Sequence, residues 1–178
     1  DYGYTRRDIE MLAKESADSF LDFVNAFYDS VLRKANKKIW AEKTPGNIFC
    51  FNAFSDMLPN AKLVHIVRHP QDCIASLTNR GMPHYQACVT YLLNTAHGLQ
   101  YEGMKNLYVL KYEELVTEPE KSLIALFKYL DVDFETQVLE PDQEVEGTDY
   151  MEGWRYRESD SIASGSKGRF KALPITEQ

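Results

Sequence analysis

LVHIVRHPQDCIAS, residues 63–76, is the stretch that decides the fold. Residues 63–67 form a continuous apolar run around His65, which is typical of a strand buried on both faces of a parallel sheet. Pro70 predicts the start of a helix, because proline suits the first helical position. Asp72 then falls in the first turn, where the helix dipole favours a carboxylate. The stretch therefore predicts a strand, a turn at Arg68, and a helix.

The same alternation of strands and helices extends along the chain. Helical spacing of apolar residues predicts helices over residues 7–34, just after Gly46, through residues 85–99 and from Pro119 onward. Further strands are predicted at residues 37–43 and 107–110. This order predicts an α/β fold, with a parallel sheet flanked by helices and right-handed crossovers. The 178 residues are the size of one domain, so we expect a single domain over residues 1–178.

Bulk composition narrows the functional classes. A formal net charge of -7 argues against a nucleic-acid partner, since nucleic-acid binders usually carry a basic excess. There is no run of about 18 apolar residues, so no membrane span is expected. Three cysteines without metal-like spacing indicate no disulfide framework, which favours a reducing compartment. We therefore expect a cytoplasmic protein, with the Golgi lumen as the alternative.

The ends of the predicted strands carry the basic residues of interest. Ligands of open α/β sheets bind at the carboxyl ends of the strands. Arg68 lies at such an end beside a helix N-terminus, a place that favours anions, and its guanidinium can bind a phosphate through two hydrogen bonds. Ser76, on the second turn of the helix, could add a hydroxyl. The alternative is that Arg68 pairs with Asp72 or Glu113 and only closes the end of the strand.

Two further basic features are weaker when taken alone. Lys43 follows the first predicted strand and could stabilise a transferring anionic group as a point charge, or be a solvated loop lysine. Glu42 beside it could orient Lys43, act as a base, or be its surface partner. Near the C-terminus, the glycines of the segment GSKGR, residues 165–169, would allow the backbone to approach an anion closely. The alternative there is an ordinary basic tail.

These separated features form one pattern, which resembles the PAPS-dependent sulfotransferases. Residues 68–76 match the family's 3'-phosphate motif, R-D/H-P-x-D-x-x-x-S, with His69 in the variable second place. The run KYEEL at residues 111–115, the Pro-Glu helix after it and the basic glycine segment are also similar to the family. The fold that the resemblance implies is a P-loop-type three-layer sandwich. The lack of a histidine near Lys43 favours the carbohydrate, tyrosylprotein and bacterial branch.

The resemblance also implies roles for individual residues. Arg68 and Ser76 would bind the 3'-phosphate of PAPS, and Lys167, Gly168 and Arg169 would close over the same phosphate. Two catalytic residues are implied, Lys43 at the transferring sulfuryl group and Ser166 in a supporting role there. The products would be a sulfated hydroxyl or amine acceptor, either a small molecule or carrier-bound, and adenosine 3',5'-bisphosphate. The family needs no metal.

One part of the family pattern has no match in the chain. The glycine-rich loop that cradles the 5'-phosphosulfate, with its strand and helix, is expected upstream of Asp1, and the catalytic base with it. Two alternatives to a sulfotransferase therefore stay open at this point. One is a P-loop nucleotide or small-molecule kinase, and the other is a non-catalytic interaction domain.

Overall fold

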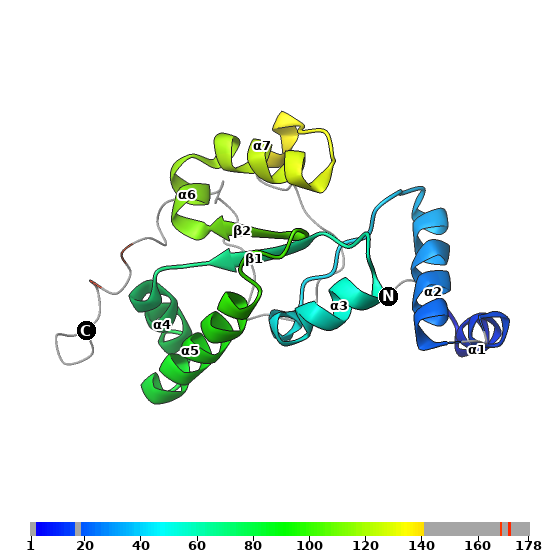
Figure 1. The fold of residues 1–178 in the computed structure, drawn as a ribbon, viewed down its shortest axis with the longest axis horizontal. Helices are drawn as coiled ribbons and strands as arrows, with labels where there is room; N and C mark the ends of the chain where they lie inside the picture. Colours follow the sequence, from blue (N-terminus) through cyan, green and yellow to red (C-terminus); the bar gives the residue numbers. More distant parts are fainter. Residues whose placement is uncertain (1–2, 17–18, 141–167, 169–170, 172–178) are drawn as a thin grey trace. The chain divides into compact units, whose positions relative to one another are not determined.

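The computed structural model describes residues 3–16, 19–140, 168 and 171, and the chain divides into two compact units. The first unit covers residues 1–47 and the second covers residues 48–178. Figure 1 follows the chain from the helices of the first unit to the sheet and helices of the second. Each unit is described by itself below.

The first unit contains two helices, α1 (Arg6–Glu15) and α2 (Phe20–Ala35), where the sequence predicted one over residues 7–34. Thr5 caps α1 with a reciprocal capping box, and the Ser19 side chain accepts a bond from the backbone N–H of Asp22 to start α2. The predicted helix is interrupted because serine favours such a helix start over a helix interior. α2 ends at Asn36, whose φ of 51° is the left-handed conformation of a helix cap.

The predicted strand at residues 37–43 is wrong. The described backbone there is irregular and has no strand partner. Instead of entering a sheet, the Trp40 ring stacks on Tyr28 of α2, with 3.9 Å between ring centroids and 7° between planes. The apolar residues of this segment are thus drawn to a helix, and local strand preference cannot reveal whether a neighbouring strand exists.

The second unit is built on a pair of parallel strands, β1 (Leu63–Val67) and β2 (Leu107–Lys111). Their register runs from Leu63 opposite Leu107 to Val67 opposite Lys111. A short 3-10 helix, η1 (Pro45–Cys50), spans the boundary of the units and leads into α3 (Phe51–Met57). Ile48, Phe51, Leu63 and Tyr101 form the buried cluster of this unit. Both strands of the described sheet were predicted from their continuous apolar runs.

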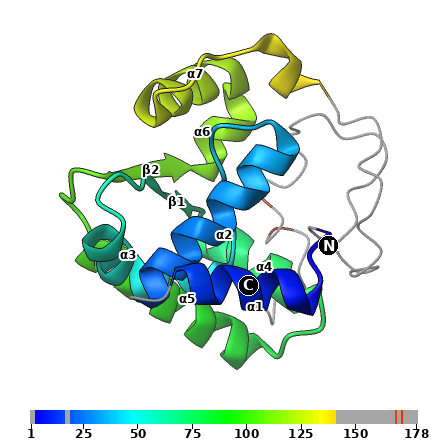
Figure 2. The ribbon, with the colours of Figure 1, turned by 90° about the vertical axis from the view of Figure 1, so that its right-hand side faces the viewer.

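Helices cover the strand pair on both sides (Figure 1). α4 (Pro70–Thr78) and α5 (His84–Gln100) lie on one side, and α6 (Tyr112–Thr117) and α7 (Pro119–Leu130) lie on the other. Figure 2 shows the same three layers from the side. A second 3-10 helix, η2 (Thr136–Leu139), follows α7. The predicted α/β class, with a parallel sheet flanked by helices, is confirmed.

The packing of α5 against β1 depends on a glycine. A Cβ added at Gly98 would stand 2.1 Å from Cε1 of His65, a separation that atoms do not tolerate. The close approach partly buries the imidazole, and this burial lowers the pKa of His65. The inner face of α5 is therefore marked by small residues, with Ala87 fully buried and Gly98 also buried.

The predicted apolar face of α5 is its outer face. Tyr85, Val89, Leu92 and Leu99 follow helical spacing, yet each is more than half exposed in the structure. The spacing of these apolar residues predicted the helix correctly, but it did not predict which face of the helix is buried. Gly98, which has no side chain, is the residue that lies against His65 of β1.

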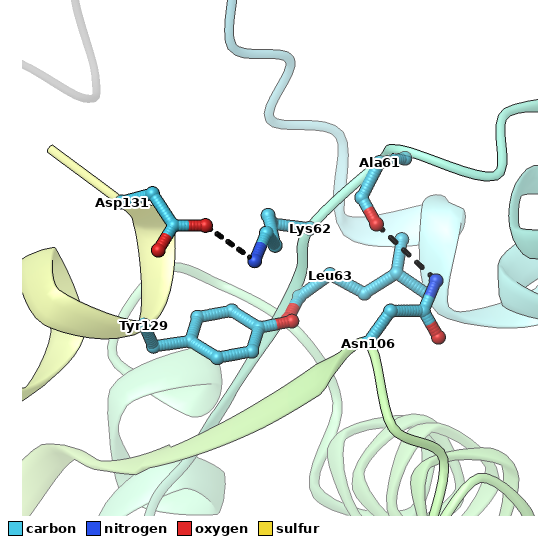
Figure 3. A network of polar contacts seen from close by, with 6 residues as sticks. All are labelled: Ala61, Lys62, Leu63, Asn106, Tyr129 and Asp131. Carbon is cyan, nitrogen blue, oxygen red and sulfur yellow. Dashed lines mark hydrogen bonds and ion pairs between the residues drawn. The ribbon is translucent and has the colours of Figure 1, made fainter.

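The amino ends of the strands are joined by the contacts in Figure 3. Asn106, just before β2, donates from its side-chain Nδ2 to the carbonyl oxygen of Ala61 at 3.2 Å. The backbone carbonyl oxygen of Asn106 accepts from the Leu63 N–H at 2.8 Å. Tyr129 of α7 donates to the carbonyl oxygen of Leu63 at 3.2 Å. Lys62 pairs with Asp131 at 2.8 Å, and this hydrogen bond raises the pKa of Lys62. These contacts fix the start of the sheet to α7.

Candidate functional site at the carboxyl ends of the strands

Arg68 lies at the point where β1 ends, as predicted, and two tyrosines hold it. Its guanidinium carbon stands 4.7 Å from the centre of the Tyr112 ring, at the start of α6, in a cation–π arrangement. The Tyr91 hydroxyl of α5 donates to the Arg68 carbonyl oxygen at 3.3 Å. The backbone of Arg68 is thus tied to one helix layer and its side chain contacts the other, so the position of the cation is set by the fold.

The residue after Arg68 connects the two strand ends. The backbone N–H of His69 donates to Oε1 of Glu113 at 2.9 Å. Because Val67 is opposite Lys111 in the parallel register, Arg68 and His69 continue beside Tyr112 and Glu113. Glu113 therefore accepts a backbone hydrogen bond across the sheet.

α4 starts at Pro70, as predicted, and presents two buried polar side chains on one face. Asp72 is 3% exposed and Ser76, one helical turn further, is 6% exposed. Oδ2 of Asp72 accepts a hydrogen bond at 2.7 Å from the backbone N–H of Gly168, 96 residues away in the sequence. Gly168 has a φ of 75°, a left-handed conformation that favours glycine. The structure thus brings Gly168 to the helix that carries Ser76 and follows Arg68.

The other predicted site residues belong to the first unit or lie outside the described residues. Lys43 is exposed and belongs to the first unit, where it follows an irregular segment in place of the predicted strand. The Glu42 carboxylate beside it accepts hydrogen bonds from the side chains of Thr44 and Asn47, so it stabilises the turn that follows. Ser166, Lys167 and Arg169 lie outside the described residues.

The cysteine on α4 offers no reactive thiolate that would suggest another chemistry. Burial raises the pKa of the Cys73 thiol on α4, which keeps it protonated and a poor nucleophile. Cys50 is exposed. Within residues 3–16 and 19–140, no group of three or more His, Cys, Asp or Glu side chains is arranged to hold a metal ion. In the same ranges, no helix has the length and hydropathy that crossing a bilayer requires.

Tyr112 was noted within the run KYEEL but not as a contact of Arg68, and two further contacts of the site were also not identified from the sequence. One is Tyr91, which lies between Ala87 and Gly98 on α5, so these small residues could have marked the face that meets the sheet. The other is Asp72, which was recognised as part of a motif but not as an acceptor for a distant backbone N–H. No local pattern reports a contact across 96 residues.

Comparison with known proteins identifies the class that this fold and site define. Residues 3–136 match the family model described as "Sulfotransferase family", which is more than half of the 178-residue chain. The chain therefore belongs to the sulfotransferase family. The matched range includes Arg68, Ser76 and Lys43, and it stops before the glycine segment at residues 165–169. Searches of curated proteins and of solved structures each gave no significant match.

Proposed function

We propose that the protein transfers a sulfuryl group from PAPS to a hydroxyl or amine acceptor. Family membership supports sulfuryl transfer in general. The observation that carries the choice of donor is Arg68, whose guanidinium is held by Tyr112 at the end of β1, directly before the N-terminus of α4. A cation at a helix N-terminus suits a phosphate group. The 3'-phosphate is the group that distinguishes PAPS from an ordinary 5'-nucleotide.

The residues present fit such a phosphate. Arg68 offers a planar fork of donors, and Ser76 offers a hydroxyl on the following helix. The nearby carboxylates of Asp72 and Glu113 each accept a backbone N–H, which satisfies part of their negative charge within the protein. In this proposal Arg68 and Ser76 bind the 3'-phosphate, and Lys167, Gly168 and Arg169 lie over it.

Bound PAPS would supply the activated sulfuryl group. In the transfer, the bond from sulfur to the bridging phosphate oxygen breaks as a bond to the acceptor oxygen or nitrogen forms, and the acceptor proton passes to a base. Lys43 offsets the negative charge that develops on the leaving group, with Ser166 in a supporting role, as fixed cations do in phosphoryl transfer. No metal is required. We place this activity within one domain and in a reducing compartment, with the cytoplasm preferred to the Golgi lumen, since the three cysteines are free.

The experiment that tests the donor compares two nucleotides by calorimetry. Adenosine 3',5'-bisphosphate should bind more tightly than adenosine 5'-monophosphate, because only the former reaches Arg68 and Ser76. Arg68→Ala should weaken bisphosphate binding by roughly tenfold to a hundredfold, since a charge-assisted hydrogen bond contributes about 1.5–3 kcal/mol, and should leave the monophosphate unaffected. Arg80→Ala, just beyond the other end of α4, is the matched control. Equal binding of both nucleotides, or preference for ATP with Mg²⁺, would contradict the proposal.

A further inference from the structure

The contact between Asp72 and Gly168 has features that a simple structural contact does not need. Asp72 is a carboxylate, yet it is 3% exposed, and burying a charge is unfavourable unless hydrogen bonds compensate. Part of the compensation comes from its place in the first turn of α4, where the helix dipole favours negative charge. The Gly168 N–H supplies a further part at 2.7 Å, which is the length of a charge-assisted hydrogen bond.

Gly168 is suited to this contact by its backbone. Among the described residues, a Cβ at this position would meet only Cδ of Lys171, at 4.0 Å. What favours glycine is the φ of 75°, which L side chains rarely adopt. The same region is closed by a turn in which the Lys171 N–H donates to the Gly168 carbonyl oxygen at 3.1 Å. Gly168 therefore directs its N–H to Asp72 while its carbonyl oxygen accepts from Lys171.

The position of Asp72 relates the contact to the proposed phosphate site. Asp72 lies four residues after Arg68 and four residues before Ser76, on the buried face of α4 that Ser76 shares. We propose that Asp72 is a positioning residue, which holds the backbone at Gly168 beside the N-terminal turn of α4 and so completes the binding site for the 3'-phosphate. The link to the phosphate rests on the proposed function. The link between Asp72 and Gly168 does not.

Two substitutions at Asp72 separate its hydrogen bond from its bulk. Asp72→Leu removes the acceptor, whereas Asp72→Asn retains an oxygen that accepts the Gly168 N–H. Gln71→Ala, at the exposed neighbouring position on α4, is the control. Trypsin gives a direct readout, because Lys167 and Arg169 are the residues on either side of Gly168. Cleavage at exposed Lys105 serves as the internal reference.

Asp72→Leu should speed tryptic cleavage at Lys167 and Arg169, relative to Lys105, on the order of tenfold. Asp72→Asn should be cleaved at these two sites almost as slowly as the parent protein, and Gln71→Ala should not differ from the parent. Binding of adenosine 3',5'-bisphosphate should follow the same order, weakest in Asp72→Leu. Gly168→Ala, which keeps the N–H but strains the φ, should also speed cleavage without any change to α4.

The outcomes are distinguishable. Unchanged cleavage at Lys167 and Arg169 in folded Asp72→Leu overturns the inference, and if that variant does not fold, unchanged cleavage in Gly168→Ala does so. Faster cleavage with unaltered bisphosphate affinity overturns the positioning role. If the parent protein binds no bisphosphate while cleavage responds as expected, the proposed donor is wrong and the contact between Asp72 and Gly168 stands.

Discussion

The two ends of the strand pair β1 and β2 are built from different contacts. At the amino end, backbone carbonyls are bonded by Asn106 and Tyr129, and the charged residues Lys62 and Asp131 meet on the surface (Figure 3). At the carboxyl end, a cation lies against an aromatic ring, and buried or bridging carboxylates accept backbone N–H groups.

This difference indicates that the two ends of the short sheet have different roles. The amino-end contacts join structural elements to one another. The carboxyl-end contacts fix the direction of Arg68 and the position of Gly168, which is the work expected of a binding site. Substitutions at the amino end should therefore change the free energy of unfolding, and those at the carboxyl end should change nucleotide affinity.

Gly98→Ala should disturb the amino and the carboxyl end of the strand pair at once. The added methyl group collides with His65, so α5 must move away from β1, and Tyr91 moves with it. Overpacking costs about 1–3 kcal/mol and alanine returns about 1 kcal/mol of helix propensity, so a net loss of up to about 2 kcal/mol is expected in urea unfolding. Gly46→Ala, where a Cβ meets no other described residue within 4 Å, is the control. Equal stability of both variants would show that His65 turns aside freely.

Asn106→Ala should affect stability alone. It removes the bond to Ala61 and the side-chain contact with Ser55, and a net loss of about 1 kcal/mol in the free energy of unfolding is expected. Bisphosphate affinity measured by calorimetry should not change. Asn52→Ala, at an exposed position on α3, is the comparison. A fall in affinity would show that the two ends of the sheet are coupled.

Tyr112→Leu should lower bisphosphate affinity and leave the free energy of unfolding nearly unchanged. The guanidinium of Arg68 loses its ring, and a cation–π contact of about 0.5–1 kcal/mol corresponds to a roughly twofold to fivefold loss of bisphosphate affinity. Tyr112→Phe retains the ring and should retain most of the affinity. If both variants bind equally weakly, the hydroxyl and not the ring matters to the site.

The smallest effect is expected for Lys62→Ala. Its pair with Asp131 is exposed, and solvent and salt screen such pairs. The melting temperature should fall slightly at low salt and not at all at high salt. Lys121→Ala removes the similar exposed pair with Glu118 and should behave alike. A clearly larger fall for Lys62→Ala would mean that its contact with the Tyr129 ring, 5.3 Å away, contributes to stability.

The sequence was most informative where local chemistry decides the structure. The run at residues 63–67 became β1, and Pro70 and Pro119 opened helices, because apolar continuity and the geometry of proline act locally. The segment at residues 37–43 failed as a strand because strand formation needs a partner that local sequence does not reveal. The buried face of α5 was misjudged because the small residues Ala87 and Gly98 are buried, while the larger apolar residues are exposed.

The same distinction holds for the site. Arg68, Ser76 and Asp72 were recognised from the spacing of a motif within nine residues. Their partners Tyr91, Tyr112 and Gly168 come from distant segments, and only the folded chain brings them together. The residues that carry charge were thus predictable, and the contacts that orient the charge were not.

The register of the two strands determines which side chains surround the Arg68 guanidinium. The paired register ends with Val67 opposite Lys111, and the residues that follow, Arg68 and Tyr112, meet as a cation and a ring. A slip of one residue would place Arg68 opposite either Lys111 or Glu113. The first would place two cations side by side and the second would set a carboxylate against the guanidinium, so the alignment of two short strands decides which side chain Arg68 meets at this end of the sheet.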